Sequence, residues 1–209
     1  MNILVLTNIY PHENETTTNR TKVIAYFAHE WQRQGHNVVV LVNSSRFPRI
    51  YYYGAKVLQK QIQKKYSNEI SDLFWIYENH FVDHEISVIN LPIMKFLPGG
   101  RFSGKALKKQ VVKIVSHLDK KGFSPDVITG HWLNPQLFLV AQLGEIYRCK
   151  TAFVFHGDSS EKLCRKHMAQ KYINFVRNIG FRSRSSLNSA KNYLTFPQEP
   201  FLCFSGIPD

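Results

Sequence analysis

The chain has 209 residues, which suits one domain or two small ones and allows a sizeable core to be buried without disulfides or metals. Its composition, 44% hydrophobic and 20% charged, is typical of a globular protein, and no apolar run reaches the roughly 18 residues that span a membrane. There are 27 Lys and Arg against 15 Asp and Glu, and this net charge of +12 favours an anionic partner such as nucleic acid, a phosphorylated substrate or acidic lipid.

The first predicted unit is a strand, a helix and a second strand. Asn2–Thr7 (NILVLT) is continuously apolar and rich in branched residues, which predicts a strand covered on both faces. Apolar residues then recur at helical spacing over 22–34, and Gly35 is placed to follow the end of that helix. Asn37–Val42 (NVVVLV) repeats the first pattern. These three segments predict a βαβ unit.

The second half of the chain alternates in the same way, after an irregular stretch over 44–100 in which we expect one or two strands. A basic amphipathic helix is expected to end before Gly122, and a helix after 134 has Pro135 in its first turn. Strands are expected at 124–132, 150–157, 179–183 and 200–206, with a helix of roughly 15 to 20 residues after the second and a short helix from Ser185. The alternation predicts an α/β fold with a Rossmann-like, doubly wound, mostly parallel sheet.

Polar residues close two of the predicted parallel strands. His131 ends one strand, and His156 and Asp158 directly follow another. Ligands of such sheets bind beyond the carboxyl ends of the strands, so we expect these side chains to meet at one edge. A single histidine there is more often a hydrogen-bonded structural residue. Two such histidines make a functional and a structural role about equally plausible.

The loop after the first strand lacks the motifs of nucleotide-binding enzymes. Neither G-x-G-x-x-G nor the Walker pattern is present, and no glycine precedes Gly35, so a dinucleotide site is not expected. Residues 16–21 (TTTNRT) instead bring hydroxyls, an amide and a guanidinium to a helix N-terminus, which favours an anion. Thr17 or Thr18 acting as a plain N-cap is the alternative, and both roles are compatible.

Metal motifs and paired cysteines are also missing from the sequence. The nearest approach to D-x-D is Asp83-His84-Glu85, and there is no H-E-x-x-H, so we expect no metal and no bound cofactor. Cys149, Cys164 and Cys203 are far apart and odd in number, which predicts buried free thiols in a reducing compartment. The N-terminus lacks the features of a signal peptide, so a cytoplasmic location is expected.

Five segments, taken together and in order, resemble the N-terminal half of family-4 glycosyltransferases. They are MNILVLTNIYP, WQRQGHNVVVLV, PDVITGHWLNPQ, KTAFVFHGD and FSGIPD, and the pair PDVITGHW and FHG is the most telling. The resemblance covers nearly the whole chain except the details of 44–100. It implies a retaining, sugar-nucleotide-dependent enzyme of the GT-B fold, in which two Rossmann-like domains face each other across a cleft.

On this resemblance, residues 1–205 are the acceptor-side domain and 206–209 begin a linker to a C-terminal donor-binding domain. The whole protein would then move a sugar from a nucleotide-sugar donor to a glycan or lipid-linked acceptor. The 209-residue chain, as a fragment or a natural truncation, is expected to be inactive alone. The first loop departs from the family, whose members often have glycine near the donor phosphates.

The expected site residues follow from the resemblance and from the strand ends. The catalytic candidates are His156, near the transferred sugar, and Asp158, which either accepts a hydrogen bond from an acceptor hydroxyl or caps the next helix. Substrate-binding candidates are Thr18, Asn19, Arg20, His131 and Asn134. Without a metal, cationic groups must stabilise the leaving diphosphate, and Arg20 is the candidate in this half.

The segment 47–66 carries a possible membrane-binding surface. If 54–66 is helical, an apolar stripe lies beside a basic stripe, and tyrosines sit at its start. The expected contacts with an acidic membrane are Tyr52, Lys56, Lys60, Lys64 and Lys65. The alternative is that the apolar stripe packs on the sheet and the lysines are merely solvated. Co-sedimentation with acidic and neutral vesicles distinguishes the two.

Two other functions compete with sugar transfer. The charge of +12 supports a non-catalytic basic module that binds nucleic acid or an acidic membrane. However, the basic residues are scattered and no recognised nucleic-acid-binding motif occurs, so a nucleic-acid partner is not expected. The other alternative is a different GT-B enzyme, such as a sugar-nucleotide epimerase.

Overall fold

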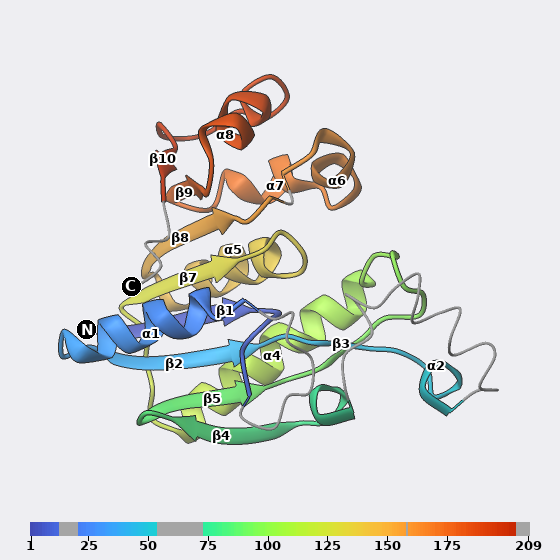
Figure 1. Ribbon diagram of the computed structural model, residues 1–209, viewed down its shortest axis with the longest axis vertical. Coiled ribbons are helices and arrows are strands. Elements are labelled where there is room, and N and C mark those ends of the chain that lie inside the picture. The colour runs from blue at the N-terminus through green and yellow to red at the C-terminus, as the bar shows by residue number, and fades with distance from the viewer. Residues whose placement is uncertain (13–20, 54–72, 158, 204–209) are drawn as a thin grey trace.

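The structure, a computed structural model, describes residues 1–12, 21–53, 73–157 and 159–203. Through these residues runs an eight-stranded sheet in the order β10-β9-β8-β7-β1-β2-β5-β4 (Figure 1). Neighbouring strands are parallel except in the β4–β5 hairpin. The strands are β1 (Asn2–Thr7), β2 (Asn37–Val42), β4 (Asn79–Asp83), β5 (Ile86–Asn90), β7 (Val127–His131), β8 (Lys150–Phe155), β9 (Asn178–Phe181) and β10 (Phe201–Leu202). The predicted Rossmann-like, mostly parallel α/β fold is confirmed.

Helices cover both faces of the sheet, which explains why its central strands are apolar at consecutive positions (Figure 1). Alternate residues of β1 and β2 belong to separate cores. Ile3 and Val5 pack with α1 (Val23–Arg33), whereas Leu4 and Leu6 share the second core. The helices that contribute to this second core are α4 (Gly104–Lys120), α5 (Gln136–Tyr147), α6 (Glu161–Lys166), α7 (Ala169–Ile173) and α8 (Arg184–Ala190).

The first βαβ unit agrees closely with the sequence prediction. β1 and β2 have the expected bounds, and α1 lies inside the expected helical segment. Gly35 has φ +83°, the left-handed conformation expected just after a helix end. Gly122, after α4, has φ +63° for the same reason.

The prediction of one or two strands over 44–100 was too low. The described part of this segment contains β3 (Ser45–Arg46), β4, β5 and β6 (Ile93–Met94), and β5 pairs with β2 to extend the main sheet. It also contains α2 (Ile50–Tyr53) and the 3-10 helix η1 (Leu73–Ile76). The hairpin was missed because its turn is His84-Glu85, both at positive φ, instead of an Asn-Gly or Asp-Gly pair.

The prediction of one long helix after β8 was also wrong. The chain forms α6 and α7 instead, and the break falls at Met168, which has φ +54°. A left-handed residue interrupts the helical hydrogen-bond pattern and turns the chain. Within the described residues, the closing strand β10 covers Phe201–Leu202, and 204–206 of the expected strand lie outside them.

Two glycines set how closely α5 packs on the sheet. A Cβ on Gly130 of β7 would collide with the side chain of Val140, and one on Gly144 of α5 with that of Thr151. The close approach buries α5 and places its N-terminus at the carboxyl edge of the sheet, directly after β7.

Other expectations concern cysteines, membranes and the chain end. The three cysteines are free thiols; Cys164 is buried, and Cys149 and Cys203 are half-buried. None of the described helices combines the length and hydrophobicity needed to cross a membrane. The expected linker over 206–209 lies outside the described residues.

Candidate functional site

Three adjacent strands deliver polar side chains to the carboxyl edge of the sheet. His131 is the last residue of β7, His156 follows β8, and Arg182 follows β9. These strands are neighbours and run parallel, so the positions just beyond their ends are also neighbours. The backbone N–H of Arg182 donates to the Phe155 carbonyl at 3.3 Å, which continues the β8–β9 pairing up to the site.

A chain of hydrogen bonds links these side chains. Nη1 of Arg182 lies 3.3 Å from Nδ1 of His156, and Nε2 of His156 lies 2.9 Å from Nδ1 of His131. A guanidinium only donates hydrogen bonds, so Nδ1 of His156 must accept. The His156 proton is then on Nε2 and is donated to His131. His131 carries its own proton on Nε2, 3.4 Å from Oγ1 of Thr129.

This arrangement keeps both imidazoles uncharged. Burial, and to a smaller extent the positive charge of Arg182, lower the pKa of His156 to about 4. Burial holds the pKa of His131 well below its ordinary value, and His156 and Arg182 add to that effect. At neutral pH the group therefore consists of two neutral rings beside one cation.

Aromatic side chains enclose the pair. The Trp132 ring stacks on His156 with centroids 4.3 Å apart and 21° between the planes. Phe27 of α1 stacks beside His131 at 6.1 Å. Trp132 has φ +65°, an unusual conformation for a bulky residue, and such strain is concentrated at functional sites.

A second polar cluster lies at the same edge, where the buried Asn43 directly follows β2 and meets buried residues of α4 and α5. Nδ2 of Asn43 donates to Oε1 of Gln136 at 2.9 Å, and Nε2 of Gln110 donates to Oδ1 of Asn43 at 2.8 Å. Nε2 of Gln136 is buried and has no hydrogen-bond partner within the described part of the chain. The cluster joins the start of α5 to β2.

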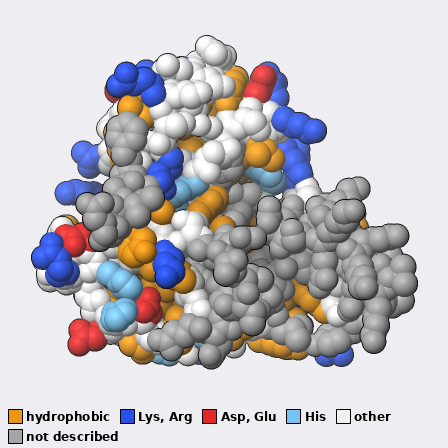
Figure 2. Space-filling model, viewed as in Figure 1, with side chains coloured by type: hydrophobic (Ala, Val, Ile, Leu, Met, Phe, Trp, Pro, Cys, Tyr) orange, Lys and Arg blue, Asp and Glu red, His pale blue; other side chains and the backbone are white. Residues whose placement is uncertain are grey.

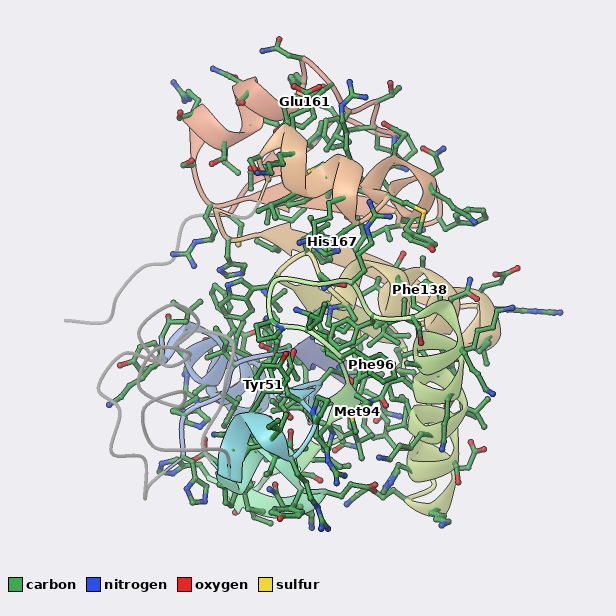
Figure 3. The ribbon with its side chains drawn as sticks, turned by 90° about the vertical axis from the view of Figure 1, so that its right-hand side faces the viewer. Tyr51, Met94, Phe96, Phe138, Glu161 and His167 are labelled. Atoms are coloured by element: carbon green, nitrogen blue, oxygen red, sulfur yellow. The ribbon has the colours of Figure 1, made fainter. Side chains whose placement is uncertain are left out.

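The structure places the predicted histidines together, as the strand-end argument required. However, His131 is only 2% exposed, so its ring is buried at this edge, and its role in substrate binding stays a prediction. Its ring lies behind His156 and is positioned to fix the orientation of that ring. Asn134 lines a small pocket with Leu133, Phe138 and His167, and the last two are labelled in Figure 3, which faces the carboxyl edge.

Most of the remaining predicted site residues fall outside the part of the chain that the structure describes. Thr18, Asn19, Arg20, Asp158, Lys56, Lys60, Lys64 and Lys65 lie outside the described residues, so their roles stay predictions. Tyr52 is half-buried, and its hydroxyl accepts a hydrogen bond from the Phe47 N–H at 3.0 Å.

Sequence reasoning missed Arg182 and Trp132. The available signal for Arg182 was its place in the segment FRSRSS, where a basic residue directly follows a predicted apolar strand. Trp132 immediately follows His131, but the stacking depends on its left-handed backbone, which no local motif indicated.

No protein-family model matches the chain, and no curated protein is significantly similar to it. Solved structures do match. An alpha,alpha-trehalose-phosphate synthase (UDP-forming) from Burkholderia vietnamiensis aligns with TM-score 0.54 and 13% identity, over 91% of this chain and 42% of its own. The alpha,alpha-trehalose 6-phosphate synthase from Burkholderia multivorans gives 0.53 and 12%, over 91% and 41%. Arabidopsis thaliana UGT89C1 complexed with UDP gives 0.50 and 12%, over 100% and 49%.

These matches show the fold: the chain has the Rossmann-like half-domain architecture of GT-B proteins. It spans less than half of the length of each of these solved structures. At this level of identity the comparison concerns architecture alone.

Proposed function

We propose that the chain is the acceptor-side half of a retaining glycosyltransferase, which moves a sugar from a nucleotide-sugar donor to a glycan or lipid-linked acceptor. The observation that carries the proposal is the hydrogen-bonded group Arg182–His156–His131 at the carboxyl edge of a Rossmann-like sheet. Ligands of such sheets bind at that edge. The UDP bound to one matched structure and the UDP-forming reaction named for another support a nucleotide-sugar donor.

Each described residue has a distinct task in this proposal. Arg182 is a cation next to His156 and would stabilise the charge that develops on the leaving diphosphate. The half-exposed indole of Trp132 offers an apolar face to a sugar ring. His131 is a positioning residue, because it accepts the Nε2 proton of His156 and thereby selects the tautomer of that ring.

The tautomer determines what His156 can do. Its Nδ1 accepts from Arg182 in this structure, so an acceptor hydroxyl reaches that nitrogen only by taking the place of Arg182. If Arg182 turns to the diphosphate, Nδ1 is released and one cause of the lowered His156 pKa is removed. His156 would then accept a hydrogen bond from the acceptor hydroxyl and take up its proton as the bond between the sugar and the diphosphate breaks and the new glycosidic bond forms on that same face, which retains the anomeric configuration.

Turnover of nucleotide sugars by the whole protein tests the proposal. Release of nucleoside diphosphate is measured for a panel of nucleotide sugars with glycan and lipid-linked acceptors, and products are identified by mass. We expect turnover with at least one donor, and a loss in kcat of about a hundredfold or more in His156→Gln, since general-base contributions have this size. Thermal melting should show that the variant remains folded.

His80→Gln is the matched control, because His80 is an exposed histidine on β4, the strand at the other end of the sheet. Its kcat should equal that of the wild type. Absence of turnover with every donor would refute the proposed function, as would equal kcat values for the wild type and His156→Gln.

A further inference from the structure

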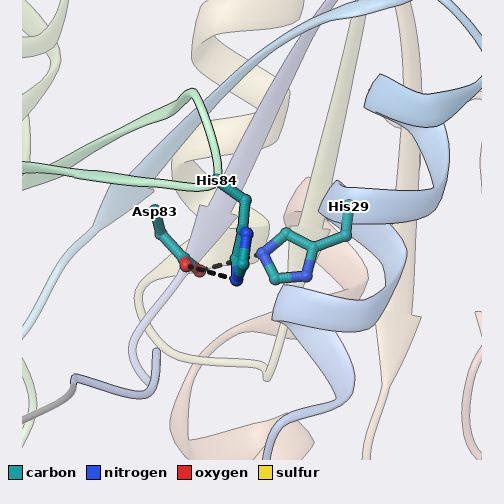
Figure 4. A group of neighbouring side chains, drawn as sticks. All are labelled: His29, Asp83 and His84. Atoms are coloured by element: carbon teal, nitrogen blue, oxygen red, sulfur yellow. Dashed lines mark hydrogen bonds and ion pairs between the residues drawn. The ribbon is translucent and has the colours of Figure 1, made fainter.

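A cluster of potential metal ligands lies at the amino edge of the parallel sheet, opposite the site described above. The β4–β5 turn brings Asp83 and His84 against His29 of α1 (Figure 4). Nε2 of His29 lies 2.9 Å from Oδ2 of Asp83, and Nε2 of His84 lies 3.9 Å from Oδ1 of Asp83. One ligand atom from each residue falls within 4.8 Å of the other two.

A buried side chain orients the carboxylate of this cluster. The hydroxyl of Tyr10 donates to Oδ2 of Asp83 at 2.7 Å, and Tyr10 is 0% exposed. Metal-binding groups in proteins are commonly held by such a second layer of hydrogen bonds. The carboxylate is therefore fixed from behind by Tyr10 while His29 and His84 face it from the outer side.

The cluster is accessible to an ion from solution. The His84 side chain is 79% exposed and that of His29 is 32% exposed. A surface recess is lined by His29, Gln32, Arg33, His84 and Glu85. Histidine side chains are visible beside acidic and basic ones at the lower left of Figure 2.

The charged side chains next to the cluster, Arg33 and Glu85, are bonded to residues outside it. Arg33 forms a two-point ion pair with Glu30, with both contacts at 2.8 Å. The carboxylate of Glu85 accepts a hydrogen bond from Nε2 of Gln32 at 3.2 Å. The Asp83 carboxylate contacts Tyr10, His29 and His84 instead.

We propose that His29, Asp83 and His84 form a binding site for a divalent first-row transition metal of the zinc type. Two imidazoles and one carboxylate suit zinc, whereas Mg²⁺ and Ca²⁺ prefer sites made of oxygen ligands. Bonds of about 2.0–2.1 Å in a tetrahedral site place ligand atoms roughly 3.3 Å apart. In the present structure one ligand atom from each of the three residues lies within 4.8 Å of the others, so small side-chain shifts would bring them to this spacing.

Three protein ligands leave one coordination position for water or a ligand from solution, and the metal joins α1 to the β4–β5 hairpin. The inference is independent of the proposed sugar transfer.

The sequence expectation that the chain binds no metal relied on missing motifs. Here only Asp83 and His84 are adjacent in the sequence, and His29 is supplied by the fold.

Metal titration of the purified chain tests the site. Zn²⁺ is titrated by calorimetry, and Co²⁺ binding is followed by its visible absorption. We expect one site whose affinity falls by at least about tenfold in each of His29→Gln, Asp83→Asn and His84→Asn, since even outer-layer changes cost ten- to a hundredfold. Asn is chosen at position 84 because it tolerates the φ of +46°. Mg²⁺ should not compete.

Two further variants sharpen the test. His80→Gln removes a histidine from the same strand, but alternation along β4 places its side chain on the face opposite to Asp83. This control should bind Zn²⁺ like the wild type. Tyr10→Phe keeps the ring and removes the hydrogen bond to Asp83, so it should weaken binding without abolishing it.

Melting curves recorded without metal establish that each variant is folded, and Zn²⁺ should raise the melting temperature of the wild type but not of the three ligand variants. The proposal is overturned if the wild type binds no Zn²⁺, if the ligand variants bind it as tightly as the wild type, or if His80→Gln loses as much affinity as they do.

Discussion

His156 is held uncharged by burial and by a guanidinium, and this single residue connects the fold to the proposed chemistry. Burial alone would lower its pKa, and Arg182 lowers it further while accepting no proton itself. The hydrogen bond to His131 then places the remaining proton on Nε2. His131 at the end of β7 and Arg182 just after β9 thus fix the tautomer of His156 between them.

The lowered His156 pKa predicts how stability depends on pH. An unfolded histidine takes up a proton below about pH 6.5, whereas folded His156 does so only near pH 4. The unfolded state therefore binds more protons between these values, and the free energy of unfolding falls as the pH falls through this range. The full shift is worth on the order of 3 kcal/mol.

Urea unfolding of the wild type and His156→Gln at about pH 7 and about pH 4.5 measures this contribution. The wild type should lose more stability than the variant between the two pH values, because glutamine does not titrate. Equal losses in the two proteins would show that His156 is not held neutral by the folded state.

At the scale of elements, α5 is the helix that organises the carboxyl edge. It directly follows β7, and its first residue Gln136 accepts a hydrogen bond from Asn43, the residue after β2. Its close approach to the sheet depends on the missing side chains of Gly130 and Gly144. The close approach of this helix thus requires both glycines.

Replacing one of these glycines should therefore be costly. Gly130→Ala adds a Cβ that collides with Val140, and overpacking of this kind costs about 1–3 kcal/mol of unfolding free energy. Gly104→Ala is the matched control, because its Cβ would meet no atom within 4 Å and alanine favours a helix by up to about 1 kcal/mol. Urea unfolding of both variants provides the comparison. A Gly130→Ala protein as stable as Gly104→Ala would contradict the packing argument.

Elements were predictable from the sequence where local pattern and burial agreed. The apolar runs of β1 and β2 indicated strands covered on both faces, and the observed bounds match. The β4–β5 hairpin was not recognised because His84 and Glu85 occupy turn positions that usually hold glycine or asparagine. The break at Met168 was not predictable because methionine ordinarily favours a helix.

At the scale of the whole molecule, the sequence indicated at which edge of the sheet the candidate site lies, but not all of the residues that form it. The rule for strand ends brought His131 and His156 together, and the structure agrees. It did not indicate that His131 would be buried or that Arg182 would join them, because both depend on how β7, β8 and β9 lie side by side. The cluster of His29, Asp83 and His84 was missed for the same reason.

The central claim is that His156 and Arg182 depend on each other in the proposed sugar transfer, because Nδ1 of His156 becomes available to the acceptor only when Arg182 turns to the diphosphate. A double-mutant cycle on kcat/KM in the whole protein tests it most directly, using His156→Gln, Arg182→Gln and the double variant. The account predicts strong coupling: the double variant should lose scarcely more than the more damaging single variant, with a coupling free energy of about 1 kcal/mol or more. Losses that simply multiply, or single variants with unchanged kcat/KM, would contradict it.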